Sequence, residues 1–354
     1  MRAEAEKILR RGAVIPALPL VLNEDRSFDE AGQRRLVRYY LSAGAGGLAV
    51  AVHTTQFEIR RPEVGLFERV AAVARDEIAR FERAQGKTVL CICGACGPAA
   101  QACAEAQQAR RLGYDAVLLS PGGLPELDEA GHIARAQAVA DILPVIGFYL
   151  QPSVGGRRFT FDYWRRLCAI PGVAAVKAAP FNRYGTLDVV RAARESGRGD
   201  SLTLYTGNDD SIVLDLLTTF CFDGQETAGV RFAGGLLGHW AVWTHTAVRL
   251  YEELRAARES GAIPARLLTL AAQVTDCNSA FFDTAHDFAG CITGIHEVLR
   301  RQGLMKGIWT LDPAETLSPG QAQEIDRVWQ SYPQLNDDAF VQAFLQAEAA
   351  QHGA

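Results

Sequence analysis

The chain has 354 residues, of which 48% are hydrophobic and 22% are charged, and its formal net charge is −5. This composition is ordinary for a globular protein with one large or two smaller domains and a core of normal size. The basic runs "RRLVR" (34–38) and "RRF" (157–159) are short and lie among apolar residues, so we expect no nucleic-acid partner.

Targeting segments are not expected either. The first 20 residues have a short apolar part that is interrupted by prolines and preceded by acidic residues, which is not typical of a signal peptide. No apolar stretch approaches the roughly 18–20 residues of a membrane span, so we expect no membrane partner. We interpret the eight cysteines, which are spread through the chain, as reduced thiols of a cytoplasmic protein.

Short runs rich in Val, Ile, Leu and Ala recur about every 30 residues, which is the size of one strand-plus-helix unit. The runs are too short to be helices and nearly uninterrupted in apolar character, which is typical of parallel strands covered on both faces. The eight predicted strands span residues 13–20, 46–52, 87–93, 114–120, 143–150, 172–178, 201–207 and 228–234.

Amphipathic segments lie between these runs. Residues 30–44 and 97–113 have apolar positions three and four residues apart, and both segments end at glycine. Asp29 stands where an N-cap acid would serve the first of them. Eight evenly spaced units predict an α/β fold, a (β/α)8 TIM barrel, over the alternative of a doubly wound open sheet.

After about residue 245 the strand signals stop. Helical patterns follow at residues 247–261, 265–282, 290–303 and 318–332. We therefore predict two regions: residues 1–245 as the barrel carrying the active site, and residues 246–354 as a C-terminal helical appendage. The appendage would cap the barrel or build an oligomer interface, and we expect its last residues, 344–354, to be frayed.

TIM-barrel active sites lie at the C-terminal ends of the strands. The polar or conformationally permissive residues at those ends are His53, Thr54 and Thr55 after the second run, Tyr149 in the fifth, Lys177 in the sixth, and Gly207, Asn208 and Asp209 after the seventh. Residues from neighbouring strands would converge on one mouth of the barrel. The sequence therefore predicts an active site at this end.

Lys177 is the residue that suggests the chemistry. It ends the apolar run "GVAAVKAAP" (172–180), where a buried charge without a partner would be costly. Burial lowers the pKa of a lysine from its usual value of about 10.4, and a neutral amine forms a Schiff base with a carbonyl substrate. Tyr149 and Thr54 can move the protons that this reaction requires, and Thr55 can hold a substrate carboxylate.

Four motifs, in order and covering about residues 12–310, resemble the dihydrodipicolinate synthase / N-acetylneuraminate lyase superfamily, whose members are class I (Schiff-base) lyases. The opening segment 14–50 resembles the family's first helix and second strand, and "HTTQ" (53–56) resembles its Gly-(Thr/Ser)-Thr-Gly loop. "LPVIGFYLQP" (143–152) resembles the segment that carries its tyrosine, and "GVAAVKAA" (172–179) resembles its lysine strand.

The resemblance implies roles residue by residue. Lys177 matches the Schiff-base lysine, Tyr149 the proton-relay tyrosine, and Thr54 and Thr55 the pair that relays protons and binds the carboxylate of a 2-oxo acid. We also expect His53, Gly207 and Asp209 to contact the substrate. A (β/α)8 barrel, a 2-oxo acid substrate, no cofactor and a homo-oligomer, a dimer or tetramer, are implied in the same way.

Departures from the family pattern affect the second half of the reaction. Where the synthases carry a Tyr-Tyr pair, this chain has Gly122 and Gly123, and where they carry an arginine for the second substrate it has Val154. The flanking glycines of the threonine loop are His53 and Gln56. We therefore expect a lyase, aldolase or dehydratase acting on pyruvate or another 2-oxo acid, not a true dihydrodipicolinate synthase.

Other interpretations of these residues stay open. Lys177 can sit in a structural ion pair, Tyr149 can be core packing, and the two threonines and Asp209 can be helix caps. His53 can merely fill the space of a lost glycine. Arg157 and Arg158 can bind a distal carboxylate or be a solvated pair, and His239 and Trp240 can be packing residues.

Two alternative functions also stay open: a metal-dependent barrel enzyme using His53, Asp209 and His239, and a barrel that senses a keto acid without turnover. The thiols of Cys91, Cys93 and Cys96 follow a C-x-C-x-x-C spacing, but the first two lie in a predicted strand. Buried cysteine in such a place behaves as a small hydrophobe. We therefore predict no metal site at this cluster.

Overall fold

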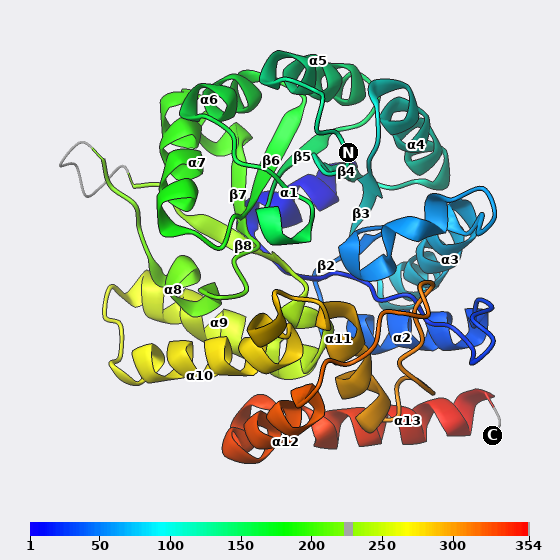
Figure 1. Cartoon of the computed structure of the whole chain (residues 1–354). Helices are drawn as coiled ribbons and strands as arrows, with labels where there is room; N and C mark the ends of the chain where they lie inside the picture. Colours follow the sequence, from blue (N-terminus) through cyan, green and yellow to red (C-terminus); the bar gives the residue numbers. More distant parts are fainter. Residues whose placement is uncertain (223–228, 353–354) are drawn as a thin grey trace.

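The computed structural model describes residues 1–222 and 229–352 and confirms the predicted TIM barrel (Figure 1). Eight parallel strands follow one another in the order β1-β8-β7-β6-β5-β4-β3-β2, and a parallel bridge between Ala17 and Ala49 closes the ring between β1 and β2. The strands are β1 (Val14–Pro16), β2 (Gly47–Val50), β3 (Leu90–Ala95), β4 (Ala116–Leu119), β5 (Val145–Leu150), β6 (Val173–Ala179), β7 (Thr203–Thr206) and β8 (Phe232–Leu237).

The last strand lies further along the chain than predicted. The prediction placed it at residues 228–234, of which residue 228 lies outside the described residues, whereas β8 runs from Phe232 to Leu237. The pair Gly234–Gly235 looks like a strand end in the sequence, since glycine weakens a strand. In the barrel, however, a Cβ on Gly234 would lie 2.3 Å from the carbonyl oxygen of Ala13, so the close approach of β8 to β1 requires glycine there.

Helices surround the barrel and extend below it (Figure 1). They are α1 (Ala3–Arg11), α2 (Glu30–Ser42), α3 (Phe67–Gln85), α4 (Ala99–Leu112), α5 (Glu129–Ala140), α6 (Phe161–Ala169), α7 (Arg183–Glu195), α8 (Ile212–Leu217), α9 (Thr244–Ser260), α10 (Arg266–Phe281), α11 (Cys291–Arg301), α12 (Gln321–Ser331) and α13 (Asp338–His352). Asp29 caps α2 as predicted, because its side chain accepts a hydrogen bond from the N–H of Gly32.

Helix α1, which the sequence analysis did not identify, lies at the centre of the ring in Figure 1. Its apolar side chains Ala5 and Leu9 are buried in the same cluster as the residues that fill the barrel. The phenol of Tyr205 on β7 donates a hydrogen bond to the carbonyl of Leu9, and Arg2 forms ion pairs with Glu82 and Asp115. Because these partners belong to the barrel's own elements, α1 is a part of the barrel core.

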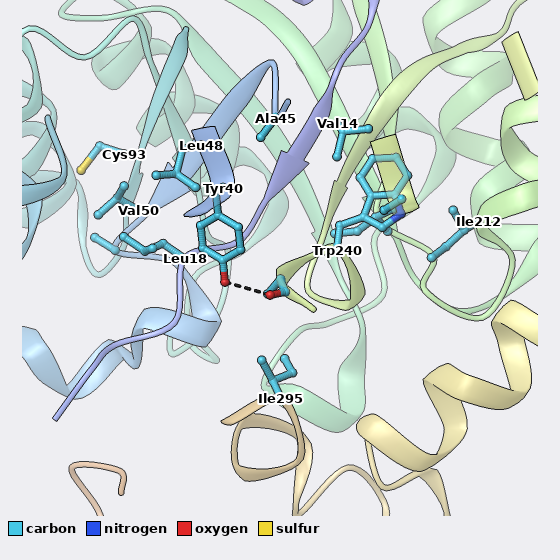
Figure 2. Close-up of a cluster of buried hydrophobic side chains, with 14 of the residues drawn as sticks. Val14, Leu18, Tyr40, Ala45, Leu48, Val50, Cys93, Ile212, Trp240 and Ile295 are labelled. Carbon is cyan, nitrogen blue, oxygen red and sulfur yellow. Dashed lines mark hydrogen bonds between the residues drawn. The ribbon is translucent and has the colours of Figure 1, made fainter. Parts of the chain in front are cut away.

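Two clusters of buried side chains lie on the two faces of the barrel wall. Inside the barrel, small residues such as Ala49, Ala116 and Ala175 pack with Ile92 and Leu118. The second cluster lies between the strands and the helices, and Figure 2 shows part of it, including the phenol of Tyr40 donating to the carbonyl of Ala241. Successive side chains of a strand point to opposite faces, so each strand contributes to both clusters.

The C-terminal helices continue directly from the barrel. Helix α9 follows β8 and contacts β1, while α10 packs against α8 and α12. The boundary predicted at residue 245 falls inside α9, and the division into two domains stays a prediction. The tail expected to be frayed is helical to His352: α13 lies along α2, where Phe344 contacts Tyr39 and Glu348 pairs with Arg38 (Figure 1).

Candidate active site

A small cavity of about 60 Å³ lies at the C-terminal ends of the barrel strands. Its polar lining residues are His53, Thr54, Gln151, Lys177, Asp209 and Cys291. Its apolar lining comes mainly from Leu118, Phe148, Leu150, Val154, Phe181 and Phe282. The cavity is therefore an apolar pocket with a few convergent polar groups, which is the usual form of a small-molecule site.

The amine of Lys177 reaches this cavity from β6. The side chain is 8% exposed, and burial lowers the pKa of the amine to about 8, against a smaller opposite effect from the carboxylate of Asp209. The Nζ atom lies 4.4 Å from the centre of the Phe148 ring. A substantial fraction of this amine is therefore neutral near physiological pH, the form in which an amine is a nucleophile.

Gly207, directly after β7, makes room for the lysine. A Cβ at this position would lie 2.3 Å from Cε of Lys177 and 2.8 Å from Cβ of Ala179. Neither atom could stay in place beside a larger residue, because contacts under 3 Å between carbon atoms are strongly repulsive. The glycine predicted to contact substrate thus also positions the lysine side chain.

Asp209 lines the same cavity, in the segment that follows β7. Its side chain is 4% exposed, and its Oδ1 accepts a hydrogen bond of 2.8 Å from the backbone N–H of His239. Burial raises the pKa of this carboxyl to about 7, although the His239 N–H and the charge of Lys177 both act to lower it. The site therefore brings together an amine and a carboxyl that both titrate near neutral pH.

The predicted threonine loop forms a short 3₁₀ helix, η1 (His53–Thr55), after β2. His53 and Thr54 line the cavity, whereas Thr55 is absent from the lining. The hydroxyl of Thr55 donates to the carbonyl of Leu18 at 2.6 Å and accepts from the N–H of Val52, and Thr54 donates to Leu18 at 3.2 Å. Thr55 therefore holds the loop onto β1 and β2, while His53 and Thr54 are the residues exposed to a ligand.

His53 is a neutral imidazole. Burial is the larger cause and the charge of Lys177 the smaller one, and together they lower the pKa of His53 to about 4.

Gln56, three residues after His53, has a positive φ of 66° where the family loop has glycine. Its side-chain oxygen accepts a 2.6 Å hydrogen bond from the N–H of Leu311. Gln56 thus ties this segment to the C-terminal region.

The expectation that Tyr149 shares a cavity with Lys177 is wrong, because the tyrosine side chain lies in the outer cluster and does not line the cavity. In the parallel register Lys177 pairs with Phe148, so these two side chains point into the barrel, while Tyr149 pairs with Ala178 and points outward. The ring of Tyr149 lies 4.8 Å from that of Trp164 on α6, in the outer cluster. Phe148, which the sequence analysis missed, takes the inward place.

The physical reason is a register irregularity between Val145 and Ile146 where β5 pairs with β6. A one-residue shift moves every later side chain of a strand to the other face. The extra residue lies on β6, because Val145 pairs with Val173 and Ile146 with Ala175, so the irregularity turns the later β6 side chains, including Lys177, inward. Strand β5 alternates without interruption and keeps Tyr149 on its outer face. A role for Tyr149 in the reaction stays a prediction, and this geometry does not favour it.

The segment between α10 and α11 covers the cavity, a contribution that the sequence analysis did not identify. Phe282 and Cys291 line the pocket, and the ring of Phe288 lies 5.7 Å from that of Phe181. Asp283 organises the segment, because it accepts hydrogen bonds from the N–H of Gly290 and the hydroxyl of Ser318. The apolar ends of helical patterns, such as "AFF" (280–282), were the available signal in the sequence.

Other predicted candidates lie elsewhere or play packing roles. Arg157 donates to the carbonyl of Leu127 and stacks on Phe159, and Trp240 is buried in the outer cluster; neither lines the cavity. His239 contacts the site through its backbone, and its ring packs near Phe281.

The cysteine cluster consists of thiols in their neutral form. Burial raises the pKa of Cys91 and Cys93 to about 12 and that of Cys96 to about 11. Across residues 1–222 and 229–352, no group of three or more His, Cys, Asp or Glu is arranged to hold a metal ion. In the same residues no helix combines the length and the apolar character needed to cross a bilayer.

The fold and the cavity together define a class: a (β/α)8 barrel with a buried lysine amine at the C-terminal ends of its strands. A family model, the Dihydrodipicolinate synthetase family, matches residues 10–330, and the chain belongs to this family. Among curated relatives, the N-acetylneuraminate lyase of Escherichia fergusonii is 28% identical over 208 residues, which cover 58% of this chain and 65% of the relative. The match thus spans less than two-thirds of that relative's length.

Solved structures with the same fold include two enzymes. The dihydrodipicolinate synthase of Oceanobacillus iheyensis superposes with a TM-score of 0.73 at 17% identity, covering 93% of this chain and 99% of the other. The N-acetylneuraminate lyase of Fusobacterium nucleatum gives a TM-score of 0.70 at 17% identity, covering 91% and 99%.

A third solved structure with this fold is a complex with a small 2-oxo acid. It is a prophage protein of the dihydrodipicolinic acid synthase family from Escherichia coli K12 in complex with pyruvate, with a TM-score of 0.72 at 19% identity and coverage of 90% and 98%.

Proposed function

We propose that this protein is a class I lyase in which Lys177 forms a Schiff base with pyruvate or another small 2-oxo acid. The observation that carries the proposal is the amine of Lys177, buried at the cavity with its pKa lowered to about 8. Family membership supports it, and so does the pyruvate complex of the Escherichia coli relative. The small volume of the cavity also suits a small acid.

The reaction would begin with attack of the neutral Nζ of Lys177 on the ketone carbon of the acid. One proton moves from nitrogen to oxygen to give a neutral carbinolamine, which takes up one proton at its hydroxyl and loses water to leave an iminium ion. The iminium then accepts the electron pair of a breaking C–C bond, or of a C–H bond before an elimination. His53, Thr54 and Gly207 surround the lysine and would contact the bound acid.

The finer specificity follows from what the cavity wall contains. Val154, which stands where the synthases carry an arginine, lines the cavity beside Leu118, Leu150 and Phe148. An apolar wall at this side gives no cation for a second carboxylate, so we propose a lyase, aldolase or dehydratase and not a true dihydrodipicolinate synthase. A cytoplasmic location and a homo-oligomeric state are part of the same proposal.

Borohydride reduction in the presence of pyruvate tests this function. The expected result is a mass increase equal to one reduced pyruvate adduct, mapped by peptide mass spectrometry to Lys177, together with loss of activity. Lys177→Ala and Lys177→Arg are the matched controls and should give no adduct while remaining folded by circular dichroism.

Two outcomes would contradict the proposal. One is an adduct on another lysine, or on none, under conditions in which the wild-type protein is folded. The other is turnover by Lys177→Ala at the wild-type rate. Ligand-dependent thermal stabilisation without any product in a broad 2-oxo acid screen would instead indicate a keto-acid sensor.

A further inference from the structure

The proposed reaction needs a group that transfers protons at the cavity, and Tyr149, the tyrosine expected to do so, faces away from it. Carbinolamine formation and dehydration at Lys177 both require proton transfer. The phenol nearest in sequence, Tyr149, packs on Trp164 outside the barrel, and the residue that faces Lys177 from β5 is Phe148. Proton transfer must therefore come from one of the polar groups that line the cavity.

Most of those groups are poorly suited. The hydroxyl of Thr54 donates to the carbonyl of Leu18, and the amide of Gln151 does not exchange protons at neutral pH. Burial raises the pKa of the Cys291 thiol well above its ordinary value, so the thiol is a weak acid here. His53, with its pKa lowered to about 4, is a neutral imidazole near pH 7, and its remaining N–H is a very weak acid.

Asp209 remains, and its geometry suits the task. The carboxyl is buried at the cavity, on the segment directly after Gly207, where an added Cβ would lie 2.3 Å from Cε of Lys177. The backbone N–H of His239 fixes Oδ1 at 2.8 Å, while no side chain of the described residues hydrogen-bonds to Oδ2. One oxygen is thus anchored, and the other is left for a ligand.

Resting on the function proposed above, we propose that Asp209 is the catalytic acid and base of this site. The protonated carboxyl gives its proton to the hydroxyl of the neutral carbinolamine at Lys177, and the C–O bond breaks to release water. The products are an iminium cation and the Asp209 carboxylate, so charge and protons balance. The carboxylate then takes a proton from the substrate in the bond-breaking step and is ready to donate again.

The electrostatics of the pocket predict a specific pH profile. The groups that face Asp209 are Lys177 from β6, His53 from η1, the His239 backbone, the neighbouring Asp210 and Cys291 from α11. Adduct formation needs Lys177 neutral, which favours pH above about 8, and Asp209 protonated, which favours pH below about 7. The rate should therefore be bell-shaped with its maximum between those values.

The test compares wild type with Asp209→Asn and with Asp210→Asn, which changes the adjacent carboxyl that does not line the cavity. Protein is mixed with pyruvate, quenched with borohydride at intervals, and the adduct fraction is read by intact mass. Asp209→Asn should form the Lys177 adduct about 100-fold more slowly, within the usual range for loss of a general acid, and Asp210→Asn should stay within about threefold of wild type.

The pH profile separates catalysis from a structural effect. Asp209→Asn should lose the alkaline limb and keep only a rise with pH, displaced to lower pH because the carboxylate no longer raises the pKa of Lys177. Adduct formation at the wild-type rate, or an unchanged alkaline limb, would overturn the assignment.

Two further outcomes are separable. If Asp209→Asn does not fold, the wild-type profile decides: a bell shape supports the assignment, and a rate that only rises with pH overturns it. Failure of the wild-type protein to form any adduct would refute the proposed function instead.

Discussion

At the scale of single residues, Gly207 has the most direct effect on the lysine. A Cβ at this position would overlap Cε of Lys177 at 2.3 Å, so the lysine side chain would have to move. Gly207→Ala should cost about 1–3 kcal/mol of stability through overpacking. It should also slow adduct formation at Lys177 about 100-fold, since small displacements of a reacting group have effects of that size.

The measurement for Gly207→Ala combines urea unfolding with the timed borohydride assay. A folded variant with a slowed adduct rate would support the positioning role of the glycine. Adduct formation at the wild-type rate would mean that Lys177 reaches the substrate without the space that Gly207 leaves, and would contradict the expectation.

The family's sequence pattern and the geometry of this chain predict different effects of replacing Tyr149. If the sequence pattern decides the role, Tyr149→Phe removes a relay hydroxyl and lowers turnover by two to four orders of magnitude. The ring lies on Trp164 outside the barrel, and burial raises the pKa of the phenol, so we expect a change of less than about threefold. Steady-state turnover of the folded variant decides between the two.

At the scale of elements, the segment between α10 and α11 combines strain with a dense set of hydrogen bonds. Asp283, Asp287 and Phe288 have φ values of 55°, 52° and 69°, a region that non-glycine residues adopt at some cost. Asp283 offsets this cost, because its carboxylate contacts the His286 ring, the Gly290 N–H and the Ser318 hydroxyl. The Asp283 side chain therefore helps to hold the segment in place over the cavity, together with the amide of Gln321, which donates to the carbonyl of Gly290.

Asp283→Ala should release this segment. Losing hydrogen bonds to a charged group costs about 1.5–3 kcal/mol, which urea unfolding would measure. Faster hydrogen exchange across residues 282–290 is the expected local signature. Since the segment supplies Phe282 and Cys291 to the cavity wall, the affinity for pyruvate should fall more than the maximal rate of adduct formation. Unchanged exchange in this segment would contradict the role of Asp283.

At the scale of the whole molecule, the two ends of the chain meet the barrel. Helix α1 contributes Ala5 and Leu9 to the barrel core, and α13 packs on α2 through Phe344, whose ring lies 5.9 Å from that of Tyr39. The phenol of Tyr39 in turn donates to Asp337 at 2.6 Å. The barrel and the C-terminal helices thus share buried contacts.

Phe344→Ala should therefore destabilise the protein as a whole. Phe344 is buried, with 8% of its surface exposed, and truncating a buried phenylalanine costs about 3–5 kcal/mol. Glu348→Gln, on the same helix as Phe344, removes the charge that pairs with Arg38 of α2 and should cost about 1 kcal/mol or less. A single cooperative urea transition that shifts more for Phe344→Ala is expected. A shift no larger than that of Glu348→Gln would contradict it.

Local periodicity in the sequence is enough to predict the barrel and to place Lys177 near the end of a strand. Eight apolar runs at even spacing predict the strands. Lys177, Gly207 and Asp209 fall at strand ends even when the predicted strand boundaries shift by a residue or two. Their meeting at one mouth then follows from the parallel arrangement.

Which residues surround Lys177 depends on the tertiary structure. Phe148 faces it in place of Tyr149 because the pairing of β5 with β6 shifts near Val145, and no local pattern encodes a register between strands. Phe282 and Cys291 reach the cavity from more than a hundred residues further along the chain, and α13 becomes ordered against α2. Such contacts depend on which surfaces meet after folding, and this is set by the packing of the whole chain.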